Sequence, residues 1–172
     1  MTVDVLKAGG VLLLAALVQV SMASSIEVAE GHPDLVLVLV IAIALLRGPV
    51  FGAVAGFWAG LVLDIASLET LGLTSLLLTL AGYFAGRLGD VTTRSSAHPS
   101  LVAVGLGTIG FAFGSAVVHF MLGSTLSAGQ FFLAVLLPSL ALNLLLAYPL
   151  YGLCRRLFQT EPRERREMSP VV

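Results

Sequence analysis

The few side chains in this sequence that could do chemistry are not spaced as a catalytic site requires. Ser115 and His119 are one helical turn apart, but no acidic residue near them in the sequence would orient the imidazole for hydrolysis. Cys154 is the only cysteine, which excludes an intrachain disulfide and a cysteine-based metal site. The chain also lacks paired-carboxylate, phosphate-loop and metal-binding motifs. We therefore predict that the protein is not an enzyme and uses no cofactor or metal.

Asp64 is the most informative polar residue, because it ends a long apolar stretch. An ionised acid within hydrocarbon costs about 2.5–3.5 kcal/mol, so such residues usually face the protein interior or water. Three roles are open to this carboxylate: a hydrogen bond to the following turn or to a neighbouring helix, contact with a partner or ligand, and proton transfer.

Three glycines, Gly52, Gly56 and Gly60, precede Asp64 at intervals of four residues. Successive members rotate by only about 40° on an α-helix, so the four residues form one stripe. Glycines at this spacing allow another helix backbone to approach closely. The stripe therefore predicts either packing within the bundle or a docking groove for the helix of a partner.

Composition and hydropathy indicate that these residues lie in a membrane. Only 11% of the residues are charged and 58% are hydrophobic, whereas about 25% are charged in a soluble domain. Six helices are expected, over residues 8–25, 33–46, 50–66, 72–88, 100–122 and 128–154. The fold class is therefore an all-α integral membrane protein with six transmembrane helices. Residues 1–158 form the transmembrane domain, residues 159–172 are expected to be a disordered cytoplasmic tail, and no nucleic-acid-binding surface is predicted.

The basic residues predict the orientation of these helices. All nine fall in alternate connections or at the termini: Lys7, Arg47, Arg87, Arg94, Arg155, Arg156, Arg163, Arg165 and Arg166. Because Lys and Arg in short loops stay cytoplasmic, both termini are expected to be cytoplasmic. The first apolar segment is longer than the core of a signal peptide, so we interpret it as a retained helix.

Local signals mark the limits of the second and third helices. Pro33 and Asp34 suit a helix N-terminus, and the sequence Arg47-Gly48-Pro49 predicts a tight turn. The second helix spans only about 21 Å, less than the roughly 30 Å hydrocarbon core. It is therefore either packed away from lipid or extended by Arg47 reaching toward the headgroups. In the last helix, Pro138 and Pro149 predict a bend or a hinge.

The stretch from Pro33 to Gly89 resembles the rod shape-determining protein MreD family. The marks of the resemblance are the pair Pro33-Asp34, then Gly56 and Gly60 leading to Asp64, then Leu71-Gly72-Leu73, and Gly82 to Gly86. Over the rest of the chain, the length, the six spans and the cytoplasmic ends also agree with this family.

This resemblance implies a non-catalytic scaffold of the bacterial elongation (Rod) complex, in the inner cell membrane as a multi-pass protein. Such proteins bind the membrane helix of MreC, and through it are connected with MreB and with RodA and its penicillin-binding partner. The matching positions Asp34, Gly56, Gly60, Asp64 and Gly72, together with Gly52 of the stripe, are then expected to serve helix packing or partner contact.

The alternative is the substrate-binding membrane subunit of an energy-coupling-factor vitamin transporter, which is also a small six-helix bundle. A vitamin site should present several polar and aromatic groups from the outer loops and helix ends. The expected outer side offers a sparse polar set: Glu27, Glu30, His32, Glu69, Ser124, Thr125 and Gln130. This scarcity favours the scaffold.

Overall fold

The computed structural model describes residues 2–23, 33–68, 71–91, 98–121 and 136–158, and all its regular elements are helices. They are α1 (Thr2–Ala23), α2 (Leu35–Arg47), α3 (Pro49–Ser67), α4 (Leu73–Val91), α5 (His98–Met121) and α7 (Leu137–Phe158). Within these ranges the structure contains no β-strand.

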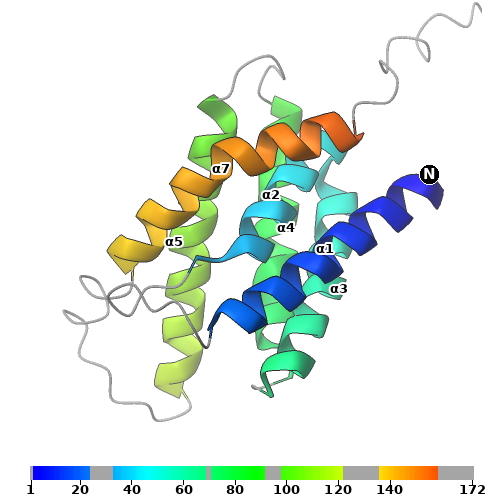
Figure 1. Cartoon of the computed structure of the whole chain (residues 1–172). Helices are drawn as coiled ribbons and strands as arrows, with labels where there is room; N and C mark the ends of the chain where they lie inside the picture. Colours follow the sequence, from blue (N-terminus) through cyan, green and yellow to red (C-terminus); the bar gives the residue numbers. More distant parts are fainter. Residues whose placement is uncertain (1, 24–32, 69–70, 92–97, 122–135, 159–172) are drawn as a thin grey trace, which may run out of the picture.

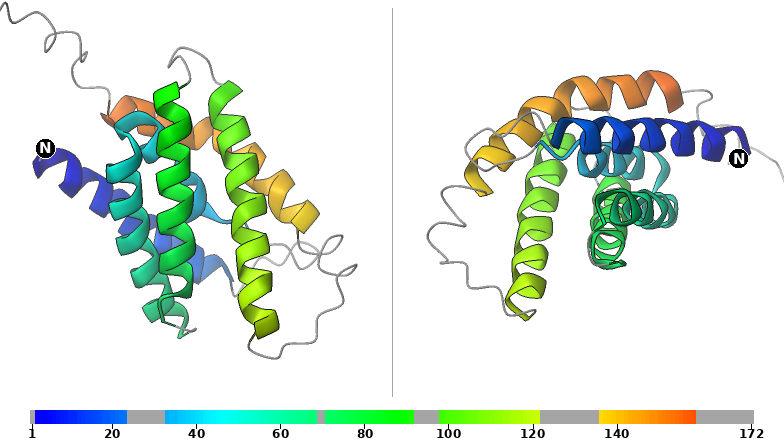
Figure 2. Two further views of the ribbon diagram at one scale, coloured as in Figure 1. Left: turned by 180° about the vertical axis from the view of Figure 1, so that it is seen from behind. Right: turned by 60° about the horizontal axis from the view of Figure 1, so that its bottom comes forward.

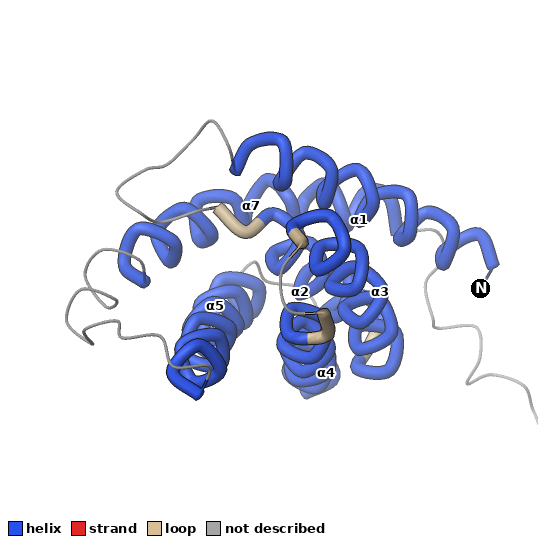
Figure 3. Tube along the Cα trace, turned by 90° about the horizontal axis from the view of Figure 1, so that it is seen from below, coloured by secondary structure: helices blue, strands red, loops and turns tan. Residues whose placement is uncertain are grey.

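The helices are arranged in two layers with α2 between them. Helices α3, α4 and α5 lie side by side and form one layer (Figure 2). Helices α1 and α7 cross obliquely on the other side, and the view along the bundle shows α2 enclosed between the two layers (Figures 1 and 3). The short helix α2 packs against each of the other five helices.

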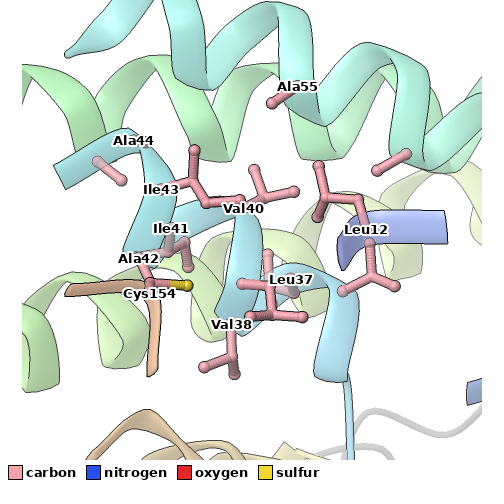
Figure 4. Packing of buried hydrophobic residues seen from close by; sticks show 14 of the residues in the cluster. Leu12, Leu37, Val38, Val40, Ile41, Ala42, Ile43, Ala44, Ala55 and Cys154 are labelled. Atoms are coloured by element: carbon pink, nitrogen blue, oxygen red, sulfur yellow. The ribbon is translucent and has the colours of Figure 1, made fainter. Parts of the chain in front are cut away.

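Helix α2 forms the core of the bundle because it is apolar on every side. Its ten consecutive residues from Val36 to Leu45 are all buried. Figure 4 shows side chains of this run, among them Leu37 and Ile41, near Leu12 of α1, Ala55 of α3 and Cys154 of α7. With 13 residues, or about 20 Å, α2 does not need to cross the hydrocarbon alone, since protein surrounds it.

Arg47 ends α2 and joins it to α7. Its Nη2 atom donates to the carbonyl oxygen of Phe158 at 3.3 Å, and its guanidinium lies 5.5 Å from the centre of the Phe158 ring. The short second helix was expected either to pack away from lipid or to be extended by Arg47 toward the headgroups. In the structure α2 is packed away from lipid, and Arg47 is directed to the end of α7.

Several helix limits differ from those predicted. Pro33 precedes the helix instead of opening it, because Asp34 is the N-cap of α2. Helix α3 begins one residue early, at Pro49, after Gly48 with φ of +96°. Helix α7 contains Pro149 and continues past Cys154 to Phe158. Residues 128–135 of the predicted sixth helix and the tail 159–172 lie outside the described residues.

The outer surface of the bundle suits lipid. Large apolar side chains are exposed on α1, α3, α4, α5 and α7, for example Leu14, Trp58, Phe84, Phe113 and Leu145. Three described helical segments are long and apolar enough to cross a membrane: Pro49–Ser67, Ser100–Val118 and Leu137–Phe158. Val5–Ser21 and Leu35–Arg47 are shorter apolar helical segments.

Candidate functional site

The N-terminus of α2 is a polar point inside the bundle. Figure 1 shows α2 beginning about midway along α5, inside the bundle. The first N–H groups of a helix have no partner within it. Away from water, within the membrane bundle, an unpaired N–H group would cost several kcal/mol. Other groups must therefore accept these hydrogen bonds.

Three side chains accept hydrogen bonds there, from α1, from α7 and from the N-cap residue of α2. The Asp34 carboxylate accepts from the N–H of Leu37 at 3.0 Å, as an N-cap does. Gln19 of α1 accepts from the N–H of Val36 at 2.9 Å, and its own amide donates to the Asp34 carboxylate at 3.1 Å. Asn143 of α7 accepts from the N–H of Asp34 at 2.8 Å.

Asn143 extends this network to a fourth helix. Its side-chain amide donates to the hydroxyl oxygen of Thr108, midway along α5, at 3.2 Å. Both side chains are buried. The network of Gln19, Asp34, Thr108 and Asn143, here called the α2 cap network, therefore fixes α1, α5 and α7 to one end of α2.

Asp64 caps a second helix from a distance in the sequence. It lies in the last turn of α3 with 1% of its surface exposed. Its carboxylate accepts from the N–H groups of Gly72 at 2.8 Å, Thr74 at 3.2 Å and Ser75 at 3.3 Å. These groups belong to the N-terminus of α4, whose dipole also favours a negative charge there.

The turn between α3 and α4 has the backbone geometry that this cap requires. Leu68 ends α3 in the left-handed conformation, with φ of +54°. Gly72 has φ of +94°, which glycine adopts without strain, and its N–H points at Asp64. No atom outside its local backbone lies near the position of a Cβ at Gly72, so its role is conformational and not one of close packing.

The glycine stripe of α3 lies against the backbone of α4. A Cβ atom added to Gly52 would lie 2.6 Å from the carbonyl oxygen of Gly82, and one added to Gly60 would lie 2.6 Å from the backbone nitrogen of Ser75. A Cβ added to Gly56 would overlap the carbonyl oxygen of Leu78. Side chains cannot fit between these backbones, so α4 already occupies the groove and a partner helix would need another face.

The glycines of α4 continue the same contact toward the other end of the bundle. Gly82 faces the backbone of Gly52, and Gly86 faces that of Pro49. Ser75 adds a hydrogen bond from its hydroxyl to the carbonyl oxygen of Phe57 at 3.0 Å. Helices α3 and α4 therefore form a closely packed hairpin with Asp64 at its closed end.

Sequence reasoning identified some of these polar residues and missed others. Asp34 and Asp64 were singled out, and the structure places them in two separate caps. Gln19, Thr108 and Ser75 were not, although a lone polar residue in an apolar helix is a signal that it faces the protein interior. Cys154 is buried on α7, and the side chain of His119 lies outside the described residues.

The chemistry of both clusters is hydrogen bonding between helices. Every buried side-chain nitrogen or oxygen atom in the described part of the chain has a hydrogen-bond partner. Within the same residues, no group of three or more His, Cys, Asp and Glu side chains is placed to hold a metal ion.

Comparison with known proteins gives the family. The family model described as rod shape-determining protein MreD matches residues 7–160, which include all six described helices apart from the first turns of α1. No curated protein and no solved structure matches the chain. Because the family model covers most of the sequence, the chain belongs to the rod shape-determining protein MreD family, a membrane family with a structural role in determining rod shape.

Proposed function

We propose that this protein is a membrane scaffold of the bacterial elongation complex. It binds the transmembrane helix of MreC and so helps organise lateral peptidoglycan synthesis by RodA and its penicillin-binding partner, in connection with MreB. In this proposal the protein crosses the inner membrane six times with both termini in the cytoplasm. It acts through binding free energy and carries out no reaction.

The observation that carries the proposal is the use of the polar side chains that lie between the helices. Gln19, Asp34, Asn143 and Asp64 all direct their side chains to neighbouring helices of the same chain. A transporter subunit would instead direct such groups to its ligand. Internal hydrogen bonds of this kind support a rigid body that presents an unchanging outer surface.

The contact with MreC belongs on that outer surface. Helix α4 covers the stripe of Gly52, Gly56 and Gly60, so another protein cannot pack against these glycines. What remains available to another membrane helix is the exposed apolar side chains of α1, α3, α4, α5 and α7. Association of helices in lipid is driven by van der Waals packing and interhelical hydrogen bonds, which such faces supply.

Depletion of the protein in its rod-shaped host tests the proposal against transport. The scaffold predicts rounded or widened cells whose shape no vitamin supplement restores. The purified protein is expected to carry no vitamin at stoichiometric level by mass spectrometry. Restoration of growth by a single vitamin, or a bound vitamin in the purified protein, would support the transporter subunit instead.

A further inference from the structure

The ends of α4 and α7 converge at the turn between α2 and α3. The end of α4 reaches it because Gly86 lies against Pro49, and a Cβ added to Gly89 would lie 2.8 Å from the carbonyl oxygen of Leu45. The end of α7 reaches it because Arg47 donates to the carbonyl oxygen of Phe158. Figures 1 and 2 show these helix ends together at one end of the bundle.

This convergence brings arginines of α4 and α7 to the same end of the bundle. Arg155 and Arg156 lie in the last turn of α7, and Arg87 lies near the end of α4. All three side chains are exposed, whereas Arg47 is partly buried and donates to the carbonyl oxygen of Phe158. We call Arg87, Arg155 and Arg156 the arginine cluster.

The described acidic residues leave this cluster with net positive charge. Asp90, one turn after Arg87 on α4, is the exposed acidic side chain described near it. Asp34 and Asp64 begin α2 and end α3, away from the cluster, and their carboxylates accept hydrogen bonds from backbone N–H groups. Three exposed cations beside one exposed anion attract an anionic ligand.

We propose that the arginine cluster binds the headgroups of anionic phospholipids. In the proposed six-span orientation, on which this inference rests, these helix ends lie at the cytoplasmic membrane surface, where a bilayer has its phosphates. Arginine binds phosphate through paired N–H donors. Exposed apolar side chains adjoin the cluster in the sequence, with Leu153 two residues before Arg155 and Leu88 directly after Arg87. An anionic headgroup attached to acyl chains matches both features, whereas an acidic soluble protein matches only the charge.

Native mass spectrometry and reconstitution of the purified full-length chain test this site without any partner protein. The probes are vesicles of phosphatidylcholine alone and an equimolar mixture of phosphatidylcholine and phosphatidylglycerol. We expect phosphatidylglycerol to be retained preferentially by the native chain. Each arginine replaced, as in Arg155→Gln or Arg156→Gln, should weaken this retention about fivefold.

The matched control is Lys7→Gln, which removes one exposed cation from α1, a helix that does not belong to the arginine cluster. This variant should retain phosphatidylglycerol nearly as the native chain does, and the helical circular dichroism of all variants should be unchanged. Equal retention of both lipids by the native chain would overturn the proposal. So would equal losses for Arg156→Gln and Lys7→Gln, because these would indicate diffuse attraction. Loss of a co-purifying acidic protein in the Arg156→Gln variant, with lipid retention unchanged, would assign the cluster to a protein partner and also overturn the proposal.

Discussion

The side-chain oxygen of Asn143 in α7 accepts a hydrogen bond from the backbone N–H of Asp34, 109 residues earlier in the chain, at 2.8 Å. This bond satisfies a backbone group that begins α2 inside the bundle. It also fixes α7 relative to the core helix, because the same amide donates to Thr108 of α5. One side chain thus connects α2, α5 and α7.

Truncation of this side chain should destabilise the bundle. Asn143→Ala leaves the N–H of Asp34 and the hydroxyl of Thr108 without their partner, at a cost of about 1–2 kcal/mol. We expect a lower midpoint for thermal unfolding in detergent. Leu145→Ala on the same helix is the matched control, since Leu145 is 74% exposed, and it should change the midpoint little. Equal midpoints for the two variants would mean that the α2 cap network does not hold α7 in place.

The glycine stripe should tolerate no side chain at its centre. Gly56→Ala introduces a Cβ that overlaps the carbonyl oxygen of Leu78, and a backbone atom cannot move aside as a side chain can. We expect a loss of about 1–3 kcal/mol in stability, seen as reduced accumulation in membranes and earlier thermal unfolding. The matched control is Gly110→Ala on α5, because no atom lies within 4 Å of a Cβ added there. Normal accumulation of the Gly56 variant would show that α3 and α4 are not packed this closely.

Two substitutions at Asp64 separate its hydrogen bonds from its charge. Asp64→Ala removes the acceptor for the N–H groups of Gly72, Thr74 and Ser75, and should cost about 1–2 kcal/mol. Asp64→Asn keeps one carbonyl oxygen, which can still accept from Gly72 and Ser75, so its unfolding midpoint should lie between those of the native and alanine proteins. Cell shape should follow stability across the series. Loss of shape in the asparagine variant at normal protein level and stability would instead show that the charge itself is required.

Helix limits were predictable where the sequence contains local turn and cap signals. Arg47-Gly48-Pro49 predicted the turn between the second and third helices, and Asp34 marked the start of α2, because their backbone requirements are local. The end of α7 was placed too early, since arginines were expected to follow the helix and instead form its last turn. Apolar pattern indicates that a helix is in a membrane, whereas the end of the helix also depends on contacts such as that between Arg47 and Phe158.

The site was less predictable because its contacts are distant in sequence. The spacing of Gly56 and Gly60 predicted close helix packing but could not say whether the neighbour was α4 or another protein. The α2 cap network joins single polar residues of four helical segments, and no spacing rule relates Gln19 to Asn143. Their role depends on where α2 begins within the bundle, which is a property of the tertiary structure.

Reporter fusions test the proposed orientation. The distribution of Lys and Arg predicts cytoplasmic signals from the C-terminus and from a site between Gly89 and Pro99, and an external signal from a site between Gly123 and Gln130. An alkaline phosphatase fusion, active outside, and a fluorescent protein fusion, active inside, provide opposite readouts at each site. A cytoplasmic signal from the site between Gly123 and Gln130 would contradict six spans.

Retention of MreC by the tagged full-length protein, purified from membranes in mild detergent, tests the proposed function most directly. Two forms of MreC should be compared, the native protein and one whose transmembrane helix is replaced by an unrelated helix of the same length. We predict that the native form is retained and the exchanged form is lost, because the contact lies between membrane helices. Equal retention of both forms would place the contact outside the membrane, and retention of neither would contradict the proposal that this protein binds MreC.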